Sequence, residues 1–135
     1  MYKGQSITVI IPCLNEEQGI EKVLRAMPDF VDEKIVVDNA STDRTSDVAK
    51  SLGAIVIRED VRGYGRAYKR GFACATGDLI ITLDGDHSYP VDALSYLVEA
   101  FTALAGRKPG IRLTVLGGGL PADEILRWFP PDVRN

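Results

Sequence analysis

Two aspartates, Asp84 and Asp86, stand one residue apart directly after the apolar run LIITL. Two carboxylates held so close together repel each other unless a counter-charge lies between them. A divalent cation such as Mg²⁺ or Mn²⁺ meets that need, because it prefers oxygen ligands and commonly shares one or two carboxylates with substrate phosphates. Gly85 leaves room for a ligand beside the backbone. The pair therefore predicts a metal that bridges the protein to a phosphorylated ligand, such as a diphosphate.

Other interpretations of the same segment stay open. Both aspartates could cap the turn and the helix expected at Pro90 without binding any ligand. His87 and Ser88 follow at once and could add a metal ligand or a water contact, although a histidine at such a place is more often a turn residue. The letters DGDHS also loosely match the Asp-x-Asp-x-Thr loop of phosphatases, but that architecture carries its nucleophile on the first strand and not on the fourth.

The elements around this pair alternate between strand and helix patterns. Apolar and β-branched runs predict strands at 7–12, 34–38, 54–59 and 78–84. Helical spacing predicts helices capped by Asn15 and by Ser41 or Thr42, a third over 63–75 and a fourth beginning at Pro90. This alternation is typical of a layered α/β domain with a mostly parallel sheet.

Polar side chains gather where the predicted strands end. Ligands of such sheets bind at the carboxyl ends of the strands. Three separate strand ends carry acids or amides, and their members are Asn15, Glu16, Glu17, Asp38, Asn39, Asp84 and Asp86. Because the carboxyl ends of parallel strands share one edge of the sheet, these residues predict one site.

Bulk composition narrows the class of protein. The chain has 135 residues, which is enough for one domain, and a net charge of −3, which argues against a nucleic-acid-binding protein with a basic face. Cys13 and Cys74 are too few for a disulfide scaffold or, with one histidine, a zinc site, so we expect buried thiols in a reducing compartment. No apolar run approaches the ~18 residues of a membrane span. The start MYKGQSITVIIP is unlike a signal peptide, and we expect a cytoplasmic protein.

The pattern changes near residue 106. Residues 1–105 form the predicted ligand-binding domain, and 106–135 an atypical tail with a candidate strand (IRLTVLGG) and a short helix (ADEILRWF). The Gly-rich stretch RGYGRAYKRG is spaced wrongly for a dinucleotide-binding loop. Its cations Arg62, Arg66, Lys69 and Arg70 could meet phosphate, although a solvated helix face is the commoner role.

Four segments, in this order and spacing, resemble the inverting family 2 glycosyltransferases of the GT-A fold: VIIPCLNEE, VVDNASTDRT, GYGRAYKRGFACATGD and LDGDHSYP. The resemblance runs from about Ile7 to Phe101 and is nearest to the dolichyl- and polyprenyl-phosphate sugar synthases. It implies a three-layer α/β domain of the nucleotide-diphospho-sugar transferase type. It also implies transfer of a sugar from a UDP- or GDP-linked donor to an acceptor, a lipid phosphate or a glycan, at the inner face of a membrane.

The resemblance also implies roles for individual residues. Pro12, Leu14 and Glu16 would line the nucleotide site, and Asp38 would hydrogen-bond the base. Asp84 would approach the ribose and the metal, next to Gly85. Asp86 would hold Mg²⁺ or Mn²⁺ against the diphosphate, with Ser88 or His87 as a further metal-side candidate. The metal would then stabilise the departing nucleoside diphosphate as a Lewis acid.

Some positions depart from the family pattern. Asn39 stands where many relatives have a second acid, which should be tolerated, and Val61 where asparagine is frequent. Relatives continue beyond the matched segments with acceptor-binding elements and a catalytic base, for which this sequence offers no candidate. We therefore expect the donor-binding half of an enzyme, which is truncated, frameshifted near residue 105, or completed by a homodimer or a partner. The rival from another class is a nucleotide-binding module without turnover. A nucleotidyltransferase would carry a Gly-rich loop after the first strand, and PCLNEE is not one.

Overall fold

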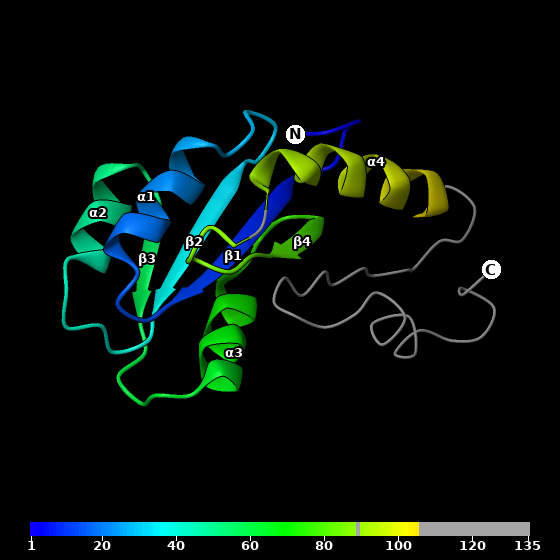
Figure 1. The fold of residues 1–135 in the computed structure, drawn as a ribbon. Helices are drawn as coiled ribbons and strands as arrows, with labels where there is room; N and C mark the ends of the chain where they lie inside the picture. The colour runs from blue at the N-terminus through cyan, green and yellow to red at the C-terminus, as the bar shows by residue number, and fades with distance from the viewer. Residues whose placement is uncertain (89, 106–135) are drawn as a thin grey trace.

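The structure of the protein is a computed structural model, which describes residues 1–88 and 90–105. Strands and helices alternate along the chain as the sequence predicts (Figure 1). Their order is β1 (Ile7–Cys13), α1 (Glu17–Arg25), β2 (Glu33–Asp38), α2 (Thr45–Ser51), β3 (Ile55–Arg58), α3 (Tyr64–Cys74), β4 (Leu79–Thr82), the 3₁₀ turn η1 (Val91–Ala93) and α4 (Leu94–Ala105). The strand and helix expected after residue 106 lie outside the described residues.

The four strands form one parallel sheet in the order β3-β2-β1-β4. The central strand β1 pairs with β2 from Thr8 to Cys13, but with β4 only from Ile7 to Ile10. Pro12 therefore lies in the part of β1 that has a neighbour on one side alone. The sheet is open at this end, between β1 and the chain that leaves β4.

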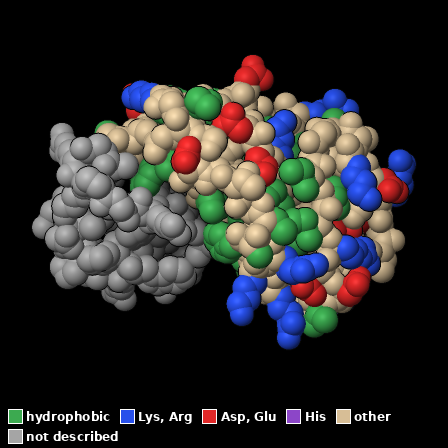
Figure 2. Space-filling view, turned by 180° about the vertical axis from the view of Figure 1, so that it is seen from behind, with side chains coloured by type: hydrophobic (Ala, Val, Ile, Leu, Met, Phe, Trp, Pro, Cys, Tyr) green, Lys and Arg blue, Asp and Glu red, His purple; other side chains and the backbone are tan. Residues whose placement is uncertain are grey.

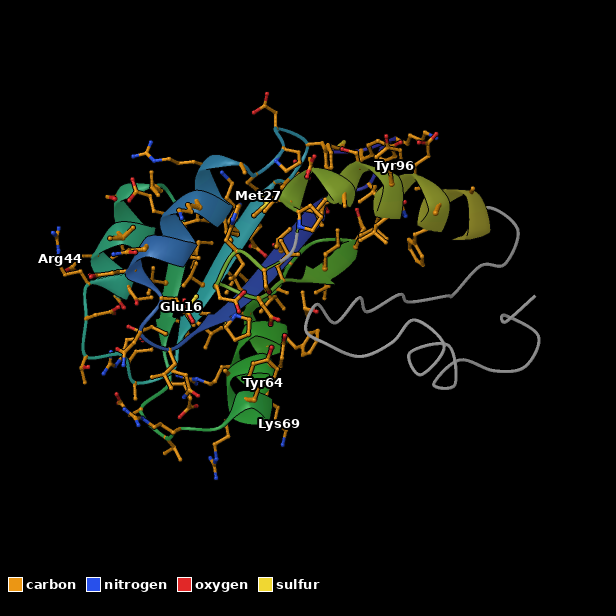
Figure 3. The ribbon with its side chains drawn as sticks, viewed as in Figure 1. Glu16, Met27, Arg44, Tyr64, Lys69 and Tyr96 are labelled. Atoms are coloured by element: carbon orange, nitrogen blue, oxygen red, sulfur yellow. The ribbon has the colours of Figure 1, made fainter. Side chains whose placement is uncertain are left out.

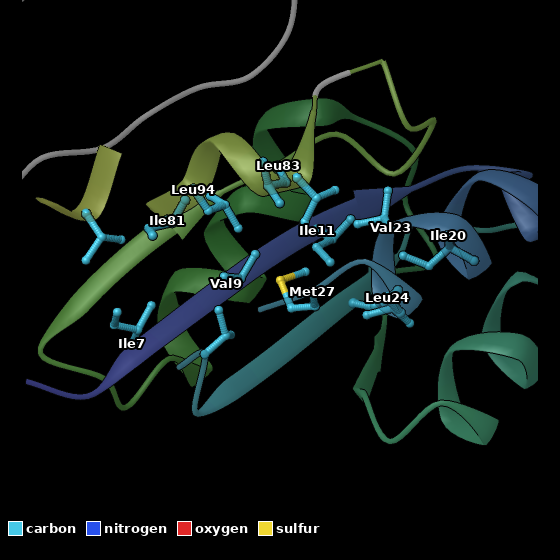
Figure 4. Close-up of a cluster of buried hydrophobic side chains, with 14 of the residues drawn as sticks. Ile7, Val9, Ile11, Ile20, Val23, Leu24, Met27, Ile81, Leu83 and Leu94 are labelled. Carbon is cyan, nitrogen blue, oxygen red and sulfur yellow. The ribbon is translucent and has the colours of Figure 1, made fainter. Parts of the chain in front are cut away.

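Helices cover both faces of the sheet, which gives three layers. On one face, Ile7, Val9 and Ile11 of β1 pack in a core with residues of α1 and α4 (Figure 4). Ala49 of α2 belongs to the same core. On the other face, Ile10 packs with Ala67 and Tyr68 of α3. A strand covered on both faces has no solvent-facing positions, which explains why β1 reads as a continuous apolar run. The layered α/β class is confirmed.

Helix α3 sits unusually close to the sheet. A Cβ atom added at Gly71, in the middle of the helix, would lie 2.4 Å from Cγ2 of Ile10. Only a residue without a side chain fits at that contact. The close approach brings the first turn of α3 near the open end of the sheet.

Two helix starts differ from the prediction. Asn15 does not cap α1, which begins at Glu17 with Glu16 in the N-cap position. Asn15 instead adopts a left-handed backbone (φ +53°), and its Oδ1 accepts hydrogen bonds from the backbone N–H groups of Thr42 (2.8 Å) and Asp43 (3.3 Å). The side chain ties the loop after β1 to the loop after β2, which a local sequence pattern cannot show.

Helix α2 begins at Thr45 and not after Ser41 or Thr42. Arg44 is in the N-cap position, and Oδ1 of Asp43, one residue earlier, accepts the backbone N–H of Thr45 at 2.9 Å. The Ser41 hydroxyl accepts the backbone N–H of Asn15 and is thereby committed to the other loop. The predicted stop at Gly53 is confirmed, because Gly53 follows the helix with φ +80°.

The two cysteines lie in different environments. Cys13, at the end of β1, is buried as expected, but Cys74 is exposed. Cys74 is the last residue of α3, where the helix ends, so the expectation of two buried thiols was wrong for it. Within residues 1–88 and 90–105, no helix is long and apolar enough to cross a membrane.

Candidate functional site

A pocket of about 330 Å³ lies at the carboxyl ends of β1 and β4. It is lined by Pro12, Cys13, Leu14, Glu16, Asn39, Arg62, Gly63, Tyr64, Ala67, Asp84, Gly85 and Asp86. From β1 the chain continues to β2 and β3 on one side of β1, and β4 then pairs with the opposite side of β1. The pocket therefore lies at the point where the strand order reverses. Ligands of open α/β sheets bind at such a point. Figure 3 labels two of the lining residues, Glu16 after β1 and Tyr64 at the start of α3.

The Asp-Gly-Asp turn forms one wall of the pocket. Oδ1 of Asp84 accepts a hydrogen bond from the Tyr64 hydroxyl, and Oδ1 of Asp86 accepts the backbone N–H of Ser88 at 2.9 Å. The hydrogen bonds with Ser88 hold the pKa of Asp86 below its usual range. Asp86 is therefore a carboxylate at neutral pH.

Gly85 lies where two other segments touch the turn. A Cβ atom at Gly85 would lie 2.3 Å from Sγ of Cys13, and one at Gly19 would lie 2.5 Å from the Gly85 carbonyl oxygen. The end of β1 and the first turn of α1 thus pack directly against the turn. The turn that carries the two aspartates is therefore closely packed on both sides.

Negative charge accumulates in the pocket. Burial and then the charges of Asp86, Asp43 and Asp84 raise the pKa of Glu16. Arg62 is the one cation among the lining residues that the structure describes. A bound cation would remove this repulsion.

The donor set fits a hard divalent cation that is shared with a ligand. Among residues 1–88 and 90–105, no group of three or more acidic, histidine or cysteine side chains is arranged to hold a metal ion alone. Mg²⁺ and Mn²⁺ do not require such a cage, because they take one or two carboxylates and complete their coordination with phosphate oxygens and water. Asp84 and Asp86 can supply those carboxylates.

The other residues of the predicted site fall into two groups. Pro12, Leu14, Glu16 and Gly85 line the pocket with the two aspartates. His87 and Ser88 do not line it; both are exposed, and His87 has a left-handed backbone (φ +61°) as expected of a turn residue. A role for either as a metal ligand stays a prediction.

Asp38 is buried and lies outside the pocket lining. Its carboxylate accepts hydrogen bonds from the Ser41 backbone (2.9 Å), the Ser46 hydroxyl and Arg58 Nη1 (3.0 Å). These contacts give it a structural role at the end of β2. Its contact with a nucleotide base stays a prediction.

Asn39, one of the strand-end residues expected at the site, lines the pocket, and so does Tyr64, which was not expected there. Oδ1 of Asn39 accepts the backbone N–H of Gly63 at 2.9 Å, which fixes the turn before α3. Tyr64 is the first residue of that helix. The only sequence signal for either residue was position: Asn39 at a strand end and Tyr64 between two glycines.

The basic residues of the Gly-rich stretch also fall into two groups, one in the pocket and one on the surface. Arg62 lines the pocket, whereas Arg70 lies 3.7 Å from Glu59 on the surface. Lys and Arg side chains gather along the lower edge of the molecule (Figure 2), and Lys69 points away from the protein (Figure 3). Most of this stretch is a solvated helix face.

Comparison with known proteins identifies the family to which the chain belongs. The sequence profile described as "Glycosyl transferase family 2" matches residues 8–105, which include every element that builds the site. The chain belongs to this family. An uncharacterized glycosyltransferase of Mycobacterium tuberculosis is 40% identical over 114 residues, which are 84% of this chain and 52% of that protein. A dolichyl-phosphate hexose transferase of Haloferax volcanii is 32% identical, over 73% of this chain and 44% of that protein.

Solved structures agree with this membership. Glucosyl-3-phosphoglycerate synthase from M. tuberculosis, crystallised with Mn²⁺, UDP-glucose and phosphoglyceric acid, superposes with a TM-score of 0.63 at 36% identity, over 73% of this chain and 40% of that one. The same enzyme has also been crystallised with Mg²⁺ and UDP. The GT-A glycosyltransferase fold is thereby confirmed, and family membership sets aside the phosphatase and nucleotidyltransferase alternatives. The chain spans about half the length of the curated relatives it matches first, 52% of the mycobacterial protein.

Proposed function

We propose that this family 2 glycosyltransferase chain binds a nucleoside-diphosphate sugar together with Mg²⁺ or Mn²⁺, for transfer of the sugar to an acceptor. The observation that carries the proposal is the Asp84-Gly85-Asp86 turn, which lines a pocket at the switch point of the sheet beside Glu16. The carboxylates of Asp84, Asp86 and Glu16 give the pocket an excess of negative charge, which contributes to the raised pKa of Glu16. A metal–diphosphate complex supplies the cation and occupies the remaining space.

Residue roles follow from position in the pocket. Pro12, Leu14 and Glu16 bind the nucleoside, and Asp84 and Asp86 hold the metal against the diphosphate. The metal, when bound, supplies Lewis-acid stabilisation of the leaving nucleoside diphosphate. Asp38 reaches the base only if the ligand draws the β2 end toward the pocket. None of the described residues is assigned as the general base.

For the nucleotide we propose UDP, supported by the solved neighbour that binds UDP-glucose at 36% identity. For the acceptor we propose a lipid phosphate, supported by the dolichyl-phosphate hexose transferase relative. For the location we propose the cytoplasmic face of a membrane, since such an acceptor is embedded in a membrane. As a protein partner we propose a second copy of this chain or another protein that contributes to the acceptor site.

Thermal unfolding with a nucleotide panel tests the donor site. UDP, GDP and CDP are compared with and without Mn²⁺ on the wild-type chain, on Asp86→Ala and on Asp29→Ala, a matched control at an exposed aspartate. Ligand at about 100 times its dissociation constant stabilises a protein by roughly 2.7 kcal/mol, which shifts the unfolding temperature by several degrees at this size. We expect a Mn²⁺-dependent shift with UDP in the wild-type chain and the control, and none in Asp86→Ala. A folded chain that responds to no nucleotide contradicts the proposal.

A second candidate function is nucleotide binding without turnover, because no described residue is assigned as the base. Incubation with UDP-sugar, Mn²⁺ and a polyprenyl phosphate separates the two. The enzyme releases UDP in proportion to glycosylated lipid, whereas the binding module shows the thermal shift and no product.

A further inference from the structure

We propose that Tyr64 is a positioning residue for Asp84: its hydroxyl fixes one carboxylate oxygen so that the other is presented to the divalent cation. The inference rests on the proposed function, since it assigns Asp84 to the metal. In this scheme Tyr64 acts on the metal through Asp84 and is not itself a metal ligand.

The hydrogen bonds of the two aspartates follow the same pattern. Oδ1 of Asp84 accepts the Tyr64 hydroxyl, and Oδ1 of Asp86 accepts the Ser88 backbone N–H. The Ser88 side chain hydrogen-bonds the Asp86 carboxylate as well. Among residues 1–88 and 90–105, the hydrogen bond found for the Asp84 carboxylate is the one from Tyr64 to Oδ1. Asp84 therefore has one oxygen fixed by the protein and one left for a ligand.

Tyr64 can orient its partner because it is itself held in place. Its ring packs edge-on against the ring of Tyr68, with the centroids 4.9 Å apart, and the Tyr68 hydroxyl donates to the Tyr64 oxygen at 3.2 Å. Tyr68 is buried under the sheet. On the other side, the bond from Gly63 to Asn39 fixes the backbone just before Tyr64. A tyrosine that is 58% exposed thus has both its ring and its main chain anchored.

The direction of the hydrogen bonds supports the same role. Tyr68 donates to Tyr64, and Tyr64 donates to Asp84, so each bond polarises the next toward the carboxylate. Partners that orient a metal ligand typically contribute 10–100-fold to metal affinity. If Tyr64 instead merely occupied Asp84 in the absence of metal, its removal would strengthen metal binding, so the sign of the effect decides.

The test is a Mn²⁺ titration at fixed UDP concentration. The signal at each Mn²⁺ concentration is the rise in unfolding temperature that UDP causes. The Mn²⁺ midpoint reports the metal affinity, and the plateau reports the nucleotide site. Tyr64→Phe removes one hydroxyl and keeps the ring contact with Tyr68. Tyr96→Phe, at a 77% exposed tyrosine of α4, makes the same chemical change far from the pocket lining.

We expect Tyr64→Phe to raise the Mn²⁺ midpoint about tenfold and to leave the plateau unchanged. Tyr68→Phe should shift the midpoint in the same direction by less, and Tyr96→Phe should match the wild-type chain. An unchanged or lower midpoint for Tyr64→Phe overturns the assignment of Tyr64 alone. A lowered plateau with an unchanged midpoint also overturns it, because the residue would then serve the nucleotide. A wild-type chain without any Mn²⁺-dependent shift overturns the proposed function and this inference together.

Discussion

Oδ1 of Asn39 accepts the backbone N–H of Gly63 at 2.9 Å, while its Nδ2 donates to the carbonyl oxygens of Glu59 (3.1 Å) and Val61 (2.9 Å). The side chain uses both its acceptor and its donors, so it works as an amide. It joins the end of β2 to the turn that carries α3 and Tyr64. The sequence pattern, in which many relatives have an acid here, gave no reason for the amide; these three contacts provide one.

Asn39→Asp should therefore destabilise the chain although it changes a single atom. An aspartate cannot donate to the two carbonyl groups and brings its charge close to them. Leaving such half-buried groups unpaired costs about 1–3 kcal/mol each in the worst case, and we expect a loss in this range overall. The free energy of unfolding in urea measures it.

Asn15→Asp is the matched control for that experiment. The hydrogen bonds found for the Asn15 side chain all use Oδ1 as acceptor, and an aspartate keeps them. We expect a change below about 0.5 kcal/mol, as for ordinary surface substitutions. Equal losses for the two variants would contradict the clamp assigned to Asn39.

Gly85→Ala should destabilise the folded chain through one contact. The added methyl group would lie 2.3 Å from Sγ of Cys13 and 3.4 Å from the carbonyl oxygen of Pro12. Overpacking of this kind costs about 1–3 kcal/mol. Cys13→Ala removes the sulfur, so the double variant should recover part of the loss, and a double-mutant cycle measures the coupling. Purely additive losses would show that the sulfur is not what excludes a side chain at residue 85.

Acid should weaken the fold through Asp38. Burial alone would raise the pKa of Asp38, but the hydrogen bonds from Ser41 and Ser46 and the charge of Arg58 outweigh it and hold the pKa below its ordinary value near 4. The unfolded chain then binds the proton more readily than the folded one. The stabilisation is thus present above about pH 4 and is lost as the pH falls through the lower, folded pKa.

Asp38→Asn should remove this part of the pH dependence. We expect a loss of about 1.5–3 kcal/mol at pH 7, the range for hydrogen bonds to a charged group, and a flatter decline in acid. Urea unfolding from pH 3 to pH 7 measures both. Asp29→Asn, at an exposed aspartate, should follow the wild-type curve; an equally flattened curve for this control would count against Asp38 as the source.

Glu16→Gln should stabilise the metal-free chain. Burial and the neighbouring carboxylates raise the pKa of Glu16, which means that its charged form is disfavoured in the fold. Loss of that charge should raise the free energy of unfolding by less than about 1 kcal/mol, as for other partly exposed charges. The gain should shrink when Mn²⁺ and UDP are present, because the cation already neutralises the pocket. Glu21→Gln, in the exposed pair with Arg25, should give no gain.

The sequence predicts the class of fold because its signal is local and repeated. β1 and β2 are recognisable as buried strands from their own residues, and Gly53 as a helix stop. The carboxylate pair is predictable for the same reason, since two acids one residue apart after an apolar run indicate a cation site without reference to any distant residue.

What the sequence does not reveal depends on residues that are distant along the chain. Asn15 looks like a helix cap until Thr42 and Asp43 are placed beside it, 27 and 28 residues further on. Tyr64 looks like an exposed aromatic residue until β4 brings Asp84 to its hydroxyl, 20 residues away. A single sequence contains both partners of each contact but no indication that they meet.

Pro12 lies where the pairing of β1 with β4 has ended, and it lines the pocket. Successive residues of a parallel strand point their N–H and C=O groups to alternate sides, and the Ile10 carbonyl accepts the N–H of Leu83 on the β4 side. Residue 12 faces that same side, so the next rung of the ladder would need its N–H, which proline lacks. The pocket at the switch point thus opens where β1 has no backbone donor to offer the chain that leaves β4.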